Sequence, residues 1–90
     1  MSPKKIIFYS ELLKAIANPH RLRILYLLKE NESSVGELEP KINLSQSALS
    51  QHLAVLRSKN IVKTRRAAQT IYYTLKDKRI YQILELLNKV

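Results

Sequence analysis

The stretch from Ser45 to Arg57 holds the side chains best suited to contact a polyanion. At about 100° of rotation per residue, a helix over this stretch gathers its leucines on one arc and small hydrogen-bonding side chains on the other. An outward face of serine and glutamine without acids can approach a DNA major groove and pair with base edges or phosphate oxygens. A merely solvated helix face would carry similar residues, so the interpretation also depends on the neighbouring elements.

A cationic cluster follows this stretch. Two β-rich runs, residues 61–66 and 70–75, are separated only by residues 67–69, and the first run contains Lys63, Arg65 and Arg66. The pattern predicts an antiparallel hairpin whose tip carries Arg65, Arg66 and Gln69. Such a tip can follow a phosphate backbone or enter a narrow minor groove, although a charged strand edge also blocks aggregation.

The overall charge supports a polyanionic partner. The 90 residues include 16 Lys and Arg against 7 Asp and Glu, which gives a net charge of +9. No carboxylate occurs from Pro40 to Lys76, so we expect phosphate-compatible donors there without a repelling neighbour. The chain has no cysteine, which excludes disulfides and favours a reducing, cytoplasmic location. Its longest apolar run is five residues, so we expect no membrane contact.

Little in the sequence suits catalysis or metal binding. His52 falls on the inward arc of its helix, where a core or boundary position is usual, and His20 has no companion at ligand spacing. Without cysteine, no cluster approaches the roughly four ligands of a zinc site. Asp77 is the only aspartate, and the serines near His52 lie on other arcs. We therefore expect no metal, no cofactor and no enzymatic activity.

The polar residues 45–57 and the basic hairpin are expected to be flanked by further helices. Apolar residues at i, i+3, i+4 and i+7 predict a first helix over about residues 6–17 and a last helix capped by Asp77. Asn18 and Pro19 end the first helix and start a second, because asparagine caps well and proline suits the first helical position.

The middle of the chain predicts two further helices. Ser34 and Glu37 form a capping box for a short helix near residues 35–41, whose end Pro40 should distort. Ser45 caps the next helix, which extends to about residue 59, and Asn60 supplies a left-handed residue at its end.

These elements predict a mainly α (α+β) fold, a winged helix-turn-helix with the order α-α-α-α-β-β-α. One domain spans residues 1–90, with the helix-turn-helix at about residues 35–59 and the wing at about residues 61–75. The candidate DNA-binding residues are Ser45, Gln46, Ser47, Ser50, Gln51, Arg57, Lys63, Arg65, Arg66 and Gln69.

The outer helices predict a homodimer. Both carry strong apolar stripes, and the short inner elements offer too little surface to cover the two of them. The candidate interface residues are Tyr9, Leu12, Leu13, Ile16, Ile80, Ile83, Leu84 and Leu87. A two-fold dimer presents two reading helices, so its operator should be an imperfect palindrome in double-stranded DNA.

Two sequence blocks resemble a known family. Residues 15–25, AIANPHRLRIL, and residues 44–57, LSQSALSQHLAVLR, together resemble the ArsR/SmtB family of dimeric winged-helix regulators, over about residues 9–76. Residues 34–38 with residues 69–73 are most similar to the HlyU/BigR-like branch, whose members do not sense metals. The resemblance implies bacterial transcription regulation, a homodimer through the first and last helices, and DNA contact through residues 45–57 and the wing.

The chain departs from the family at its sensing positions. Ser34 and Gly36 stand where the metal sensors carry cysteines, and Arg79 stands where their second site carries a histidine. The HlyU/BigR-like branch senses sulfur species or oxidants through paired cysteines, and this chain has none. Unless cysteines were replaced in a parent sequence, neither sensing chemistry operates here. The wing tip also lacks the family's usual glycine.

Two functions from different classes fit the sequence. The first is a sequence-specific DNA-binding regulator, and the second is a winged-helix module that binds an acidic protein partner. For the regulator, the sequence leaves open repression, activation by displacement of another DNA-binding protein, constitutive binding, and an apolar ligand at the dimer helices.

Overall fold

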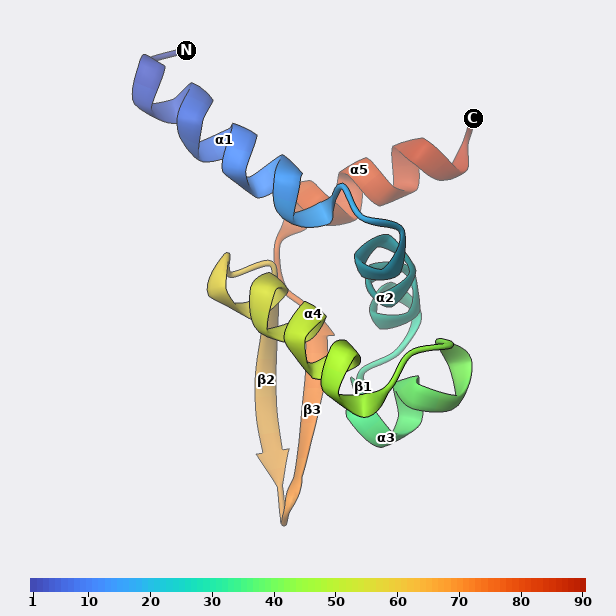
Figure 1. Cartoon of the computed structure of the whole chain (residues 1–90). Helices are drawn as coiled ribbons and strands as arrows, with labels where there is room; N and C mark the ends of the chain where they lie inside the picture. The colour runs from blue at the N-terminus through green and yellow to red at the C-terminus, as the bar shows by residue number, and fades with distance from the viewer.

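The computed structural model describes residues 1–90 and contains five α-helices, one short 3-10 helix and three strands (Figure 1). In chain order the elements are α1 (Pro3–Ile16), α2 (Pro19–Glu30), β1 (Ser33–Ser34), α3 (Val35–Leu38), η1 (Glu39–Lys41), α4 (Gln46–Ser58), β2 (Val62–Ala67), β3 (Thr70–Leu75) and α5 (Lys78–Asn88). The predicted order of helices and hairpin strands is confirmed, and β1 is a further strand that the sequence pattern did not predict.

Side-chain caps set most helix starts. Asn18 accepts hydrogen bonds from the backbone N–H groups of His20 and Arg21 at the start of α2. The Ser34–Glu37 capping box is present at α3, and Pro40 lies in η1, where the α-helix has given way to a 3-10 turn. The prediction that Pro40 distorts this end is therefore confirmed, because a proline supplies no N–H to continue the helix.

The predicted first helix began too late. The structure starts α1 at Pro3, after Ser2, whose hydroxyl accepts from the backbone N–H of Lys5. The prediction followed the apolar stripe, whereas residues 3–8 of α1 are all exposed, and the start of the helix depends on the Ser2 cap and on proline at the first position.

A three-stranded antiparallel sheet forms the wing and its anchor. The strand order is β1-β3-β2, with Ser33 opposite Tyr73 and Arg65 opposite Tyr72. Figure 1 shows the β2–β3 hairpin projecting from the side of the molecule opposite to both chain ends. The turn is one residue shorter than predicted, since β2 extends through Ala67 and only Ala68 and Gln69 connect the strands.

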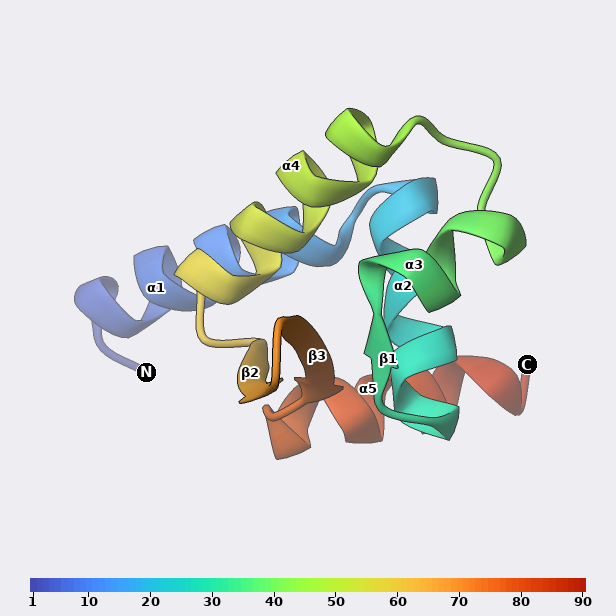
Figure 2. The same ribbon diagram turned by 90° about the horizontal axis from the view of Figure 1, so that it is seen from below.

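Fifteen buried apolar side chains form one core between the helices and the base of the sheet. Leu49, Leu53 and Leu56 of α4 are completely buried in it, as are Ile80 and Leu84 of α5. In the view of Figure 2, α4 and α5 lie on opposite sides of the hairpin. No helix has the length and apolar character that crossing a membrane requires.

Candidate nucleic-acid interface

The α4 helix presents its polar side to solvent. Ser45 caps it by accepting a 3.1 Å hydrogen bond from the backbone N–H of Ala48, as predicted, and three leucines fix the opposite side in the core. All six candidate DNA-binding residues of this segment are exposed: Ser45, Gln46, Ser47, Ser50, Gln51 and Arg57. Because no acid lies on this face, it can approach a polyanion without like-charge repulsion.

Asn60 sets the exit from α4. Its φ is 57°, in the left-handed region that asparagine tolerates better than most residues, which confirms the predicted C-terminal residue. The chain thereby turns from α4 into β2. A hollow between α4 and the wing is lined by Ser50, Ala54, Arg57 and Tyr73, together with Ser58.

The wing exposes its candidate DNA-binding residues to solvent. Lys63, Arg66 and Gln69 are all exposed, and the Arg66 Nε donates a 3.2 Å hydrogen bond to the Ala68 carbonyl oxygen across the turn. Ala68 has a φ of 56°, a conformation that an L-residue adopts only at a cost. An alanine in the left-handed conformation thus occupies the turn where members of the family usually carry a glycine.

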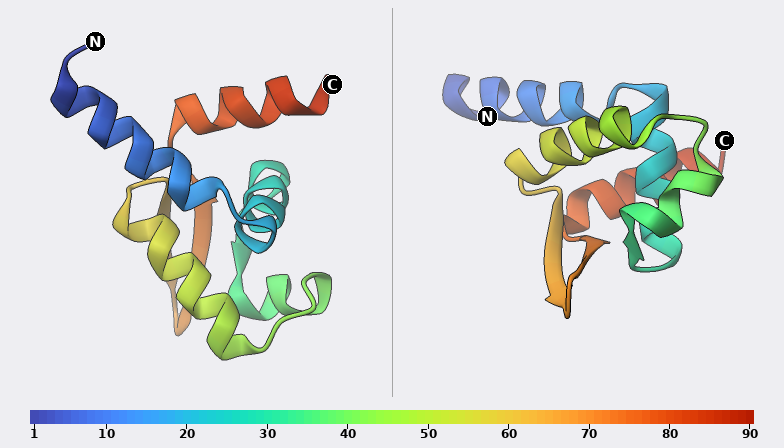
Figure 3. Two further views of the ribbon diagram at one scale, coloured as in Figure 1. Left: turned by 45° about the horizontal axis from the view of Figure 1, so that its top comes forward. Right: turned by 60° about the horizontal axis from the view of Figure 1, so that its bottom comes forward.

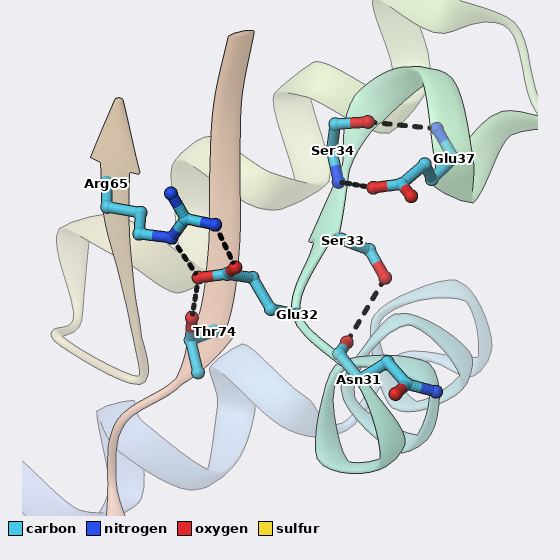
Figure 4. Close-up of polar contacts among 7 residues, drawn as sticks. All are labelled: Asn31, Glu32, Ser33, Ser34, Glu37, Arg65 and Thr74. Atoms are coloured by element: carbon cyan, nitrogen blue, oxygen red, sulfur yellow. Dashed lines mark hydrogen bonds and ion pairs between the residues drawn. The ribbon is translucent and has the colours of Figure 1, made fainter. Parts of the chain in front are cut away.

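Arg65 is held by a carboxylate that the sequence analysis did not place near it. Figure 4 shows its guanidinium meeting Glu32, which precedes β1, with Nε–Oε2 and Nη2–Oε1 distances of 2.7 and 2.6 Å. The Thr74 hydroxyl donates a 3.3 Å hydrogen bond to the same carboxylate, and the Arg65 Cζ lies 4.7 Å from the centroid of the Tyr72 ring. The hydrogen bond from Arg65 lowers the pKa of Glu32 and raises that of Arg65.

We expected the basic side chains between Pro40 and Lys76 to have no acid beside them, and this expectation is wrong at Arg65. The stretch from Pro40 to Lys76 holds no acid of its own, but the short strand β1 pairs with β3 and brings Glu32 against the wing. The sequence signal available near β1 was the Ser34 capping box, which marks where the chain turns into α3. A two-residue strand is too short to show alternation, so its pairing partner was not predictable.

The two histidines lie where α2 meets α4. Their ring centroids are 5.6 Å apart, with His52 partly buried and His20 exposed. Burial lowers the pKa of His52, and the nearby positive charge of Arg21 lowers it further. No group of three or more His, Cys, Asp or Glu side chains is placed to hold a metal ion.

The candidate dimer residues divide into two sets. Leu12, Ile16, Ile80 and Leu84 are buried within the subunit and belong to its core. Leu13 and Leu87 are each 48% exposed, and Tyr9 and Ile83 are partly buried. The structure also exposes apolar side chains that the sequence analysis did not name, namely Ile6, Ile7, Phe8, Tyr81, Leu86 and Val90.

These exposed apolar side chains, apart from Val90, come from the helices α1 and α5. In the left view of Figure 3, α1 and α5 lie at the end of the molecule away from the tip of the hairpin, and their outer ends diverge. At the start of α5, Arg79 donates to Asp77 at 2.8 Å and to the Tyr9 hydroxyl at 3.1 Å, which ties α1 to α5. An uncovered apolar surface of this kind is typical of a protein–protein interface.

A short helix, a turn, a second helix with an exposed polar face and a basic hairpin define a winged helix-turn-helix, a class of DNA-binding protein. The family model for "Bacterial regulatory protein, arsR family" matches residues 18–64. The chain belongs to the ArsR family, and it is a DNA-binding transcriptional regulator of that family.

Relatives and solved structures agree with this assignment. The transcriptional activator HlyU of Vibrio cholerae is 54% identical over 79 residues, 88% of this chain and 73% of that protein. The nodulation protein NolR of Rhizobium meliloti is 53% identical over 87% of this chain, which spans only 64% of that protein's length.

Two solved structures cover almost the whole chain. The structure of HlyU from Vibrio cholerae has a TM-score of 0.91 at 50% identity and covers 98% of this chain and 96% of that one. The repressor BigR from Xylella fastidiosa has a TM-score of 0.87 at 41% identity, with 96% and 88% covered. The resemblance to the ArsR/SmtB family and the winged-helix fold are confirmed.

Proposed function

We propose that two copies of this chain bind an imperfect palindrome in double-stranded DNA, each placing α4 in a major groove. The observation that carries the proposal is the exposed, acid-free face of α4, with Ser47, Ser50 and Gln51 at its centre. Side chains of this kind pair with base edges, which differ between base pairs in the major groove.

The wing supplies contacts of a second kind. Lys63, Arg66 and Gln69 are exposed on the hairpin. Cations at this position contact phosphates and fix the register of the protein on the duplex, without reading sequence. Arg57, near the end of α4, has the same role in the proposal.

Dimerisation supplies the second reading helix. The proposal assigns the interface to the exposed apolar side chains of α1 and α5, including Leu13 and Leu87. A two-fold dimer requires half-sites about 34 Å apart, or a multiple of that distance. The position of the operator relative to a promoter then decides whether the protein represses or activates by displacing another DNA-binding protein. Its place of action is with the chromosome, in the bacterial cytoplasm.

Neither of the family's two sensing chemistries regulates binding in this proposal. Without cysteine, the chain has no thiolate for metals or oxidants. We propose a regulator that binds its operator without either signal and whose cellular level sets occupancy.

Duplex binding by the purified chain tests this proposal. In a gel-shift assay with duplex of random sequence, we expect binding at about 0.15 M salt that weakens steeply as salt is raised. Selection from a random duplex pool should then yield sites with two related half-sites. An acidic protein as the true partner would instead give no duplex binding at that salt concentration, and this result would overturn the proposal.

A further inference from the structure

The pair of Glu32 and Arg65 links the wing to the body of the subunit. Four ion pairs are present, and this one alone includes a residue of the hairpin. Glu32 lies at the end of the loop that follows α2, directly before β1, beside Thr74 of β3. From there its side chain reaches diagonally across β3 to Arg65 on β2. The carboxylate meets the side of the guanidinium that carries Nε and Nη2, in a two-point contact.

We infer that Glu32 is an internal counter-ion that withholds Arg65 from DNA phosphates. The inference rests on the proposed function, since it concerns how the wing meets the DNA backbone. It removes Arg65 from the candidate phosphate contacts of the hairpin and leaves Lys63 and Arg66, neither of which forms an ion pair. Glu32 also lies near enough to Lys63 for the lysine charge to lower the pKa of the carboxylate, but the carboxylate is bonded to Arg65.

The geometry of the contact carries the inference. A guanidinium binds carboxylates and phosphates through the same pair of parallel N–H groups, and here Glu32 occupies one such pair. The Tyr72 ring lies 4.7 Å from the Arg65 Cζ and covers part of the guanidinium plane. A phosphate that approached the remaining N–H groups would lie close to the Glu32 carboxylate and meet like-charge repulsion.

The same pair adds little to the stability of the fold. The side chains of Arg65 and Glu32 are 56% and 32% exposed, and exposed pairs are screened by solvent. The wing is held instead by backbone pairing along β2 and β3 and by the buried residues Ile61 and Val62. Removing either charge therefore alters the field near the DNA and leaves the hairpin in place.

Three variants test the inference on a duplex of random sequence, because phosphate contacts do not depend on sequence. Glu32→Gln keeps the shape of the side chain and an acceptor for Thr74, and it frees Arg65. Its affinity should rise roughly fivefold per subunit at about 0.15 M salt, and the log–log salt slope should steepen by about 0.9 per subunit. Arg65→Gln leaves Glu32 unpaired beside the DNA and should weaken binding. The double variant should bind like the wild type.

Glu30→Gln is the matched control. It makes the same change of net charge two residues away, at the exposed end of α2, where the carboxylate has no ion-pair partner. The salt slope of this variant should equal that of the wild type. Thermal unfolding of all four variants should show that each remains folded.

The alternative arrangement predicts the opposite change in DNA affinity for Glu32→Gln. If Glu32 positions Arg65 for a phosphate, Glu32→Gln weakens binding and the double variant stays below the wild type. Either that result or an unchanged affinity of Glu32→Gln overturns the inference and leaves the proposed function standing. If the wild-type chain binds no duplex, the proposed function falls and the inference falls with it.

Discussion

Ser47, Ser50 and Gln51 are exposed because the leucines on the other side of α4 are anchored in the core. Since side chains on one helix face share a direction, burying Leu49 and Leu53 fixes which polar groups face outward. Arg66 belongs to a different element and offers charge instead of a hydrogen-bond pattern. The account therefore assigns recognition of sequence to α4 and general affinity to the wing.

Substitutions at Gln51 and Arg66 should have different effects. Gln51→Ala should reduce the preference for a selected operator over random duplex by about 1 to 3 kcal/mol, because it removes hydrogen bonds to base edges. Arg66→Ala should weaken binding to both duplexes equally and reduce the salt slope by about 0.9 per subunit. Fluorescence anisotropy with the two duplexes measures both effects. Equal behaviour of the two variants on both duplexes would contradict the division of roles.

Asp77 should make the subunit sensitive to acid. Its carboxylate caps α5 and pairs with Arg79, and the hydrogen bond from Arg79 lowers the pKa of Asp77 below its ordinary value of 3.8. A lowered folded-state pKa means that this stabilisation is present above pH 3.8 and is lost as the pH falls through the folded-state value.

Asp77→Asn tests this, because asparagine also caps a helix but carries no charge. The difference in free energy of unfolding between wild type and variant should be constant near neutral pH and should shrink below pH 3.8. Urea unfolding at several pH values measures it. A difference that stays constant down to about pH 2 would show that the charge of Asp77 does not stabilise the fold.

Helices were more predictable than strands, because their signals are local. The caps Asn18, Ser45 and Asp77 are each followed within three residues by the N–H groups that they bind, so sequence spacing revealed them. The strand β1 depends on pairing with β3 about 40 residues away, and no local pattern marks it. The Glu32 contact with Arg65 depends on that pairing and was missed for the same reason.

The wing turn should be open to stabilisation. Ala68 has a φ of 56°, which is costly for a residue with a Cβ and free of cost for glycine. Ala68→Gly should therefore raise the free energy of unfolding by about 0.5 to 1 kcal/mol.

Ala67→Gly is the control for this change. Ala67 lies within β2 at an ordinary φ, so glycine there should lower the free energy of unfolding by about 0.5 to 1 kcal/mol. Chemical denaturation compares the two variants. If both destabilise the protein equally, the turn is not strained.

The polar surface of α4 and the wing is separate from the apolar surface of α1 and α5 in the complete subunit. The wing and the exposed face of α4 lie away from both chain ends, whereas α1 and α5 carry exposed apolar side chains near those ends (Figure 1). This separation lets a dimer form without covering the DNA-binding face. The sequence already indicates which partner the DNA-binding face takes. The net charge of +9 and the acid-free middle segment favour DNA over an apolar partner at that face.

A charge on the apolar face should separate the two copies. Leu87 is 48% exposed, so Leu87→Glu should leave the fold intact and convert the proposed dimer to a monomer at micromolar concentration. Operator affinity should then fall, because one copy supplies only one reading helix.

Ile71→Glu is the matched control, since Ile71 is 41% exposed but lies on β3 in the wing. Sedimentation velocity should find this variant dimeric. A wild-type chain that sediments as a monomer would remove the proposed dimer.

Chemical protection of guanine N7 reports whether α4 lies in the major groove, because this atom faces that groove. With dimethyl sulfate and a selected operator, the account predicts protected guanines in two major-groove segments about one helical turn apart, or a multiple of one turn. Gln51→Ala, at equal occupancy, should restore methylation at positions that α4 contacts. A bound operator whose guanines all remain reactive would contradict the placement of α4 in the major groove.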